Sequence, residues 1–139
     1  MIPEKVKKWL YKAFQDFNIA RHELTFPDQE ISTGPVCFLA QQAVEKLLKA
    51  YLVWKNIDFG KTHNLDFLRE LCAQQDPEFK NLNLGNLNFY AIEIRYPDEF
   101  YLPSVQEARE ALEIASQVKE MVFKKLGIKE QDLIIPKKD

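Results

Sequence analysis

The stretch from Pro35 to Asn56 constrains the fold more than any other part of the sequence. It is rich in Ala, Leu, Gln, Glu and Lys and has no Gly or Pro after its first residue, a composition that favours an α-helix. At about 100° per residue, its apolar side chains fall on one side of that helix. These are Val36, Leu39, Ala40, Ala43, Val44, Leu47, Tyr51 and Trp54. The polar side chains Gln42, Glu45, Lys46 and Lys49 fall on the other. The stretch therefore predicts a core helix with an organised polar face.

The segment before this helix predicts a second amphipathic helix. Residues from Pro3 to Glu23 begin with a proline suited to a first helical turn and then carry apolar residues at helical spacing. Turn and cap residues interrupt that spacing from Leu24 to Gly34. We therefore expect a helix, a loop and then the core helix.

Three further helices are expected after the core helix. The first spans about Leu65 to Gln74, with Thr62 or Asn64 as its cap and Asp76-Pro77 as its stop. The second spans about Leu84 to Arg95 and ends before Pro97. The third begins at Ser104, which forms a capping box with Glu107, runs to about Leu126 and stops at Gly127. No segment alternates apolar and polar residues as a strand would, so we expect an all-α bundle of about five helices.

Size, charge and cysteine usage exclude several classes of protein. A chain of 139 residues with a net charge of −2 is the size of one domain and lacks the positive field of a duplex-DNA binder. Cys37 and Cys72 have no zinc-site spacing and are expected to be buried in a reducing cytoplasm. No uncharged stretch approaches the roughly 18 residues that span a bilayer. Cytoplasmic localisation, without membrane partners, follows by exclusion.

Three landmarks in order resemble the HEPN domain family. The stretch Cys37 to Ala50 contains an aromatic residue followed by the pattern Gln-Gln-Ala-x-Glu-Lys-x-x-Lys of the family's signature helix. It is followed by Thr62-His63-Asn64-Leu65 and later by Arg95-Tyr96-Pro97. The resemblance covers nearly the whole chain.

The resemblance implies an up-and-down bundle of four to five helices, which we assign to residues 1–127. Residues 128–139 follow the stop at Gly127 and mix an apolar patch with lysines, so we expect a frayed tail available to a partner. The resemblance also implies a homodimer, no metal or cofactor, and association with a minimal nucleotidyltransferase in a toxin–antitoxin-like system. Many members of the family are metal-independent ribonucleases in which an Arg is followed about four to six residues later by a His. Arg95 is followed by no such histidine. Enzymatic activity is therefore left open, and a binding role is favoured.

The polar face of the core helix is the first candidate site. Gln42, Glu45, Lys46 and Lys49 lie within one helical arc, so their side chains are placed to converge on a phosphate and a base edge. The alternative is that Glu45 and Lys49 form an i,i+4 ion pair on a solvated helix face.

The other candidate residues lie in the turn before the third helix and at the end of the fourth. His63 is suited to donating to a phosphate or titrating near neutral pH, or else to capping a helix. Arg95 and Tyr96 combine a guanidinium group with an aromatic ring, suited to phosphate contact and base stacking, or else to ending a helix. Asp98 and Glu99 are expected to be solvated loop acids. The aromatic residues expected in the core or a dimer interface are Phe14, Phe17, Phe38, Tyr51, Trp54, Phe89 and Tyr90.

Three hypotheses for function follow. The first is a nucleotide- or RNA-binding module whose ligand-binding residues are Gln42, Lys46, Lys49, His63, Arg95 and Tyr96. The second is a metal-independent ribonuclease that uses Arg95 and His63 for acid–base chemistry. The third is a non-catalytic subunit that docks a nucleotidyltransferase.

Overall fold

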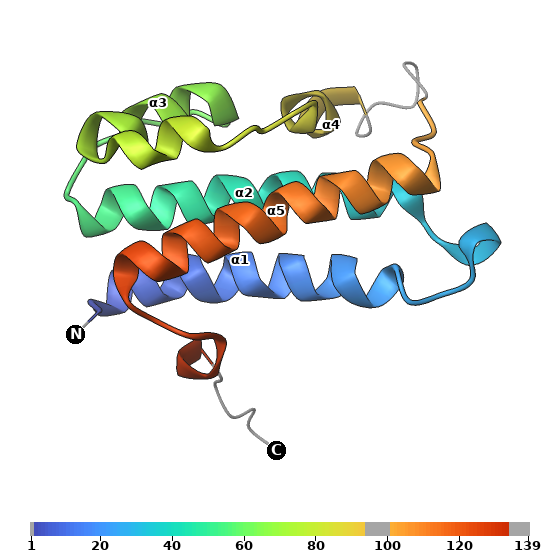
Figure 1. Cartoon of the computed structure of the whole chain (residues 1–139), viewed down its shortest axis with the longest axis horizontal. Helices are drawn as coiled ribbons and strands as arrows, with labels where there is room; N and C mark the ends of the chain where they lie inside the picture. The colour runs from blue at the N-terminus through green and yellow to red at the C-terminus, as the bar shows by residue number, and fades with distance from the viewer. Residues whose placement is uncertain (1, 94–100, 134–139) are drawn as a thin grey trace.

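The computed structural model describes residues 2–93 and 101–133, and within them it is all-helical (Figure 1). The five α-helices are α1 (Glu4–Glu23), α2 (Thr33–Trp54), α3 (Leu65–Gln75), α4 (Leu87–Glu93) and α5 (Val105–Leu126). Short 3-10 helices occur at Asp28–Glu30, Pro77–Asn81 and Glu130–Leu133. The described residues contain no strand, so the expected all-α bundle is confirmed.

Helix α2 forms the centre of the bundle. It packs lengthwise against α1 and α5, and it also contacts α3 and α4. Figure 1 shows α1 on one side of α2 and the α3–α4 layer on the other. The fully buried side chains of α2 include Val36, Ala40, Val44, Leu47 and Leu48. Because neighbours cover α2 on several sides, more of its circumference is buried than a single apolar stripe would give.

The helix ends follow their local sequence. The Asn64 side chain accepts a hydrogen bond from the backbone N–H of Phe67, which makes Asn64 the cap of α3. Ser104 and Glu107 form the expected capping box at the start of α5. Gly127 ends α5 in the left-handed conformation, with φ of 69°, where a glycine meets no Cβ penalty.

The starts of two helices differ from the sequence-based expectation. Helix α2 begins at Thr33 instead of Pro35, because a proline is tolerated within the first turn. Helix α4 begins at Leu87 instead of Leu84. Gly85 has a φ of 53°, which is incompatible with a continuous right-handed helix through this position.

Other expectations for the core hold in part. Cys37 and Cys72 are both buried and unpaired, as expected. Phe17, Tyr51 and Tyr90 belong to the core, whereas Phe89 is 40% exposed.

The expectation of a frayed tail is wrong for residues 130–133, because they form a 3-10 helix and Leu133 is buried within its own chain. The division of the chain at residue 127 stays a prediction.

No helix among the described residues combines the length and the apolar character needed to cross a membrane.

The segment after α3 contributes a core residue that periodicity does not reveal. Asp76 caps the 3-10 helix by accepting from the backbone N–H of Glu78. Phe79 is 0% exposed, and its ring centroid lies 4.5 Å from that of Tyr51. The 3-10 helix therefore covers the carboxyl-terminal end of α2.

We expect Phe79→Ala to lower the free energy of unfolding by about 3 to 5 kcal/mol, because it leaves a cavity against Tyr51. Phe67→Ala is the matched control: Phe67 is 47% exposed, so its loss should cost less than about 1 kcal/mol. Urea denaturation of both variants measures the difference. Equal losses would show that the 3-10 helix does not form part of the core.

Candidate functional site

Glu45 and Lys49, two of the polar side chains of α2, are buried, so the alternative of an ion pair on a solvated helix face is wrong. Glu45 is 4% exposed, Lys49 is 5% exposed and Gln41 is fully buried. The cover comes from α1 and from the loop between α2 and α3. The Lys49 ammonium lies 5.7 Å from the ring centroid of Trp9 and 5.3 Å from that of Phe59. The ion pair between Glu45 and Lys49 exists, but it lies beneath these aromatic rings.

The Glu45 carboxylate is the centre of a hydrogen-bond network. Its Oε2 atom accepts from Lys49 Nζ at 3.0 Å and lies 3.0 Å from His63 Nδ1. Its Oε1 atom accepts from Gln41 Nε2 at 3.5 Å. Within the described part of the chain, no buried side-chain polar atom lacks a hydrogen-bond partner. Both oxygens of the Glu45 carboxylate are thus engaged by hydrogen-bond partners.

The structure brings four of the polar candidates together. Gln42 donates to Gln41 Oε1 at 2.8 Å, which connects Gln42 with Glu45, Lys49 and His63. Lys46 points elsewhere and donates to Asp16 of α1 at 2.5 Å. Arg95, Tyr96, Asp98 and Glu99 lie outside the described residues.

His63 is the member of this network that reaches solvent, with 74% of its side chain exposed. A carboxylate only accepts hydrogen bonds, so a neutral His63 in this contact carries its proton on Nδ1. Its Nε2 atom then has a free lone pair. A buried carboxylate that fixes an exposed imidazole in this way provides a positioned proton acceptor.

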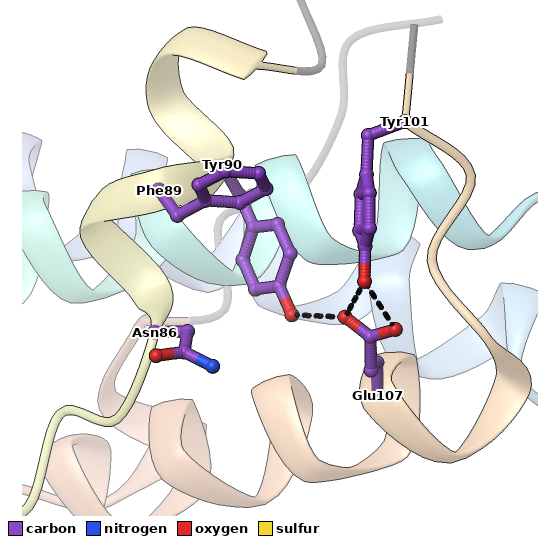
Figure 2. A pocket seen from close by; sticks show the side chains of 5 residues that line it. All are labelled: Asn86, Phe89, Tyr90, Tyr101 and Glu107. Carbon is purple, nitrogen blue, oxygen red and sulfur yellow. Dashed lines mark hydrogen bonds between the residues drawn. The ribbon is translucent and has the colours of Figure 1, made fainter.

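A second candidate site lies where α4 faces the start of α5 (Figure 2). It is a cavity of about 280 Å³ lined by Asn86, Phe89, Tyr90, Tyr101 and Glu107. The hydroxyl of Tyr90 donates to Glu107 Oε2 at 3.0 Å. The hydroxyl of Tyr101 lies 2.6 Å from Oε1 and 2.8 Å from Oε2. One carboxylate therefore holds tyrosines from both sides of the cavity, while it also caps α5.

Hydrogen bonds and burial shift the pKa values of the Glu107 and Tyr90 side chains in this second site. The Tyr101 hydroxyl holds the pKa of Glu107 below its usual range, so the carboxylate is ionised at neutral pH. Burial and the hydrogen bond to Glu107 raise the pKa of Tyr90. Burial also raises the pKa of Cys37 and of Cys72 to about 12. Both thiols stay protonated, which makes them poor nucleophiles.

The sequence pattern predicts Glu107 only as a helix cap and Tyr90 only as a residue of the core or of a dimer interface. Their contact spans 17 residues and depends on how α4 packs against α5. Periodicity within one helix carries no such information.

The described residues contain no group of three His, Cys, Asp or Glu side chains placed to hold a metal ion.

Comparison with models of protein families matches the HEPN domain over residues 6–126. This match covers α1 from its third residue, all of α2 to α5 and all three sequence landmarks. Searches of curated proteins and of solved structures found no match.

We expect Glu45→Gln to lower the free energy of unfolding by about 3 kcal/mol, because it leaves the Lys49 ammonium buried without its counter-charge. Lys49→Met should cost a similar amount. The double variant should be more stable than the sum of the two losses predicts, by about 1 to 3 kcal/mol. Urea denaturation of the four proteins measures this coupling.

The exposed pair Arg109–Asp28, at 3.2 Å, is the control for that cycle. Its coupling should stay below about 1 kcal/mol. A Glu45–Lys49 coupling no larger than this would contradict the role given to burial.

The stability contributed by Glu107 should depend on pH. Its pKa is lower in the folded state than its value of about 4.3 in model peptides. The contribution is therefore present above about pH 4.3 and is lost as the pH falls through the folded-state value. We expect the stability difference between wild type and Glu107→Gln to be largest near neutral pH and to shrink in acid. Glu120→Gln, at an exposed position of the same helix, should differ little from wild type throughout. A Glu107→Gln difference that does not change with pH would contradict the assignment.

Proposed function

This chain belongs to the HEPN domain family, whose functions involve nucleotides and RNA. We therefore propose that it is a nucleotide- or RNA-binding helical module. The observation that carries the proposal is the exposed His63 imidazole fixed by the buried Glu45 carboxylate at 3.0 Å. An imidazole in this position donates to phosphate when it is protonated and accepts from a ribose hydroxyl when it is neutral.

The roles proposed for the other residues follow from their positions. Lys49 and Gln42 act through Glu45, since their polar atoms are part of the network that holds the carboxylate. Lys46 pairs with Asp16 at the boundary between α1 and α2, so a phosphate would have to displace that carboxylate to meet the ammonium group. Arg95 and Tyr96 are proposed to contact phosphate and to stack on a base, as the family resemblance implies.

We further propose that the protein is a homodimer and the partner of a minimal nucleotidyltransferase in a toxin–antitoxin-like system. The family resemblance supports this proposal. Large apolar side chains are exposed on α3, on α4 and before α5, at Phe67, Phe89 and Leu102. Exposed apolar side chains of this size favour a contact with another protein surface.

A metal-independent ribonuclease is the second candidate, and the Glu45–His63 pair favours it. In that reaction His63 Nε2 takes the proton of a 2′-hydroxyl, whose oxygen attacks the neighbouring phosphorus. The 5′-oxygen leaves and takes a proton from solvent, and Arg95 offsets the charge on the phosphate.

The experiment is calorimetric titration with AMP, ATP and a short single-stranded RNA, with the mass in solution measured alongside. We expect a dimer that binds at least one of these ligands. His63→Ala should weaken that binding at least tenfold, a loss of about 1.4 kcal/mol. The melting temperature should change little, because the ring is mostly exposed.

His22→Ala is the control, because His22 is the other histidine of the chain and is also exposed. It should bind as the wild type does. Cleavage of the RNA that persists in EDTA and is lost in His63→Ala would establish the ribonuclease instead. A dimer that binds and cleaves nothing would overturn both candidates and leave a docking subunit.

A further inference from the structure

The amino-terminal half of α1 carries a concentration of positive charge that the proposed function does not use. Residues 4–12 contain four lysines, Lys5, Lys7, Lys8 and Lys12, and a single acid, Glu4. All four lysines are exposed. The chain as a whole has a net charge of −2, so the net charge of this half helix is opposite in sign to that of the rest of the molecule.

These lysines are available to a ligand, unlike the lysines of α2. Lys46 pairs with Asp16 and Lys49 pairs with Glu45. Within residues 2–93 and 101–133, no ion pair involves Lys5, Lys7, Lys8 or Lys12. A polyanion would thus meet these ammonium groups without displacing an internal carboxylate.

Aromatic side chains lie among the lysines. Trp9 and Tyr11 are both partly exposed, and together with Lys8 and Lys12 they line a cavity of about 220 Å³. Alternation of basic and aromatic side chains is the arrangement that binds single-stranded nucleic acid, since the cations meet phosphates and the rings stack on bases. We call the surface formed by Lys5, Lys8, Trp9, Tyr11 and Lys12 the α1 strip.

Side-chain contacts link the α1 strip to the Glu45 network. The Trp9 and Phe59 ring centroids are 6.2 Å apart, and both rings lie within 6 Å of the Lys49 ammonium. Lys49 and His63 each contact the same oxygen of Glu45. A chain of contacts therefore connects the strip with the exposed imidazole.

The length of the strip favours a nucleic-acid chain over a single nucleotide. Lys5, Lys8 and Lys12 follow one another at i, i+3 and i+7, so they share one side of the helix over about 10 Å of its axis. One phosphate group is too small to contact all three. The negative net charge of the rest of the molecule disfavours the broad surface of a duplex.

We propose that the α1 strip binds the backbone and bases of single-stranded RNA and directs the bound RNA toward His63. The proposal rests on the proposed function, because it supplies the extended part of a site whose other end is the Glu45–His63 pair. It assigns RNA, and not a mononucleotide, as the ligand of the full surface.

The test measures fluorescence anisotropy of a labelled oligouridine of about 12 nucleotides at salt concentrations from about 50 to 200 mM. The variant Lys8→Gln/Lys12→Gln should bind at least tenfold more weakly than the wild type. The slope of log affinity against log salt should fall by about 1.4, because two phosphate contacts are lost. AMP binding at the His63 end, measured by calorimetry, should be unchanged in this variant.

Lys80→Gln/Lys124→Gln is the matched control. It removes the same charge from two exposed lysines on the 3-10 helix after α3 and on the side of α5 that meets it. This control should retain RNA affinity to within about twofold, since it leaves the strip intact. Equal losses in the two double variants, or no loss in either, would overturn the proposal.

A second readout uses Trp9 itself. The chain has two tryptophans, so Trp54→Phe leaves Trp9 as the only one. Oligouridine should quench its fluorescence if bases stack on the ring, and unchanged fluorescence at saturating RNA would count against the strip. Wild-type protein that binds AMP but not RNA would overturn this inference and leave the proposed function standing. Protein that binds neither would overturn both.

Discussion

The burial of one carboxylate, Glu45, is the constraint on which the candidate site depends. An ionised carboxylate that leaves water loses several kcal/mol of solvation, which only well-placed partners offset. Here the partners come from three places in the chain: Gln41 and Lys49 on the same helix, and His63 beyond the loop. Trp9 and Phe59 complete the surroundings by lying against Lys49. The position of His63 is therefore a consequence of how α1, α2 and the following loop pack together.

The architecture explains why such a carboxylate occurs on α2. This helix has neighbours on several sides, so polar residues opposite its apolar stripe meet protein instead of solvent. The second carboxylate cluster shows the same relation between packing and chemistry. Glu107 caps α5 and also holds Tyr90 and Tyr101 across a cavity. In both places a charge that stabilises the bundle also defines a surface feature beside it.

Local sequence rules were sufficient for the existence of the five α-helices and for several of their ends, although not for the starts of α2 and α4. Ser104 with Glu107, Asn64 and Gly127 act within one turn of the chain, so their roles are visible in a few consecutive residues. The HEPN resemblance was likewise visible, because it depends on short motifs in order. The burial of Glu45 and Lys49 was not, because periodicity identifies a polar face without showing what covers it. The same limit hid Phe79 and the contact between Tyr90 and Glu107, which depend on segments far apart in sequence.

The central claim is that Glu45 fixes the orientation of the His63 imidazole. Long-range ¹H–¹⁵N correlation spectra of the imidazole nitrogens, recorded where the ring is neutral, test it most directly. The account predicts that His63 carries its proton on Nδ1 and leaves Nε2 unprotonated, and that Glu45→Gln abolishes this preference. The exposed His22 serves as the internal reference. A His63 ring protonated on Nε2, or one whose tautomer does not respond to Glu45→Gln, would contradict the account.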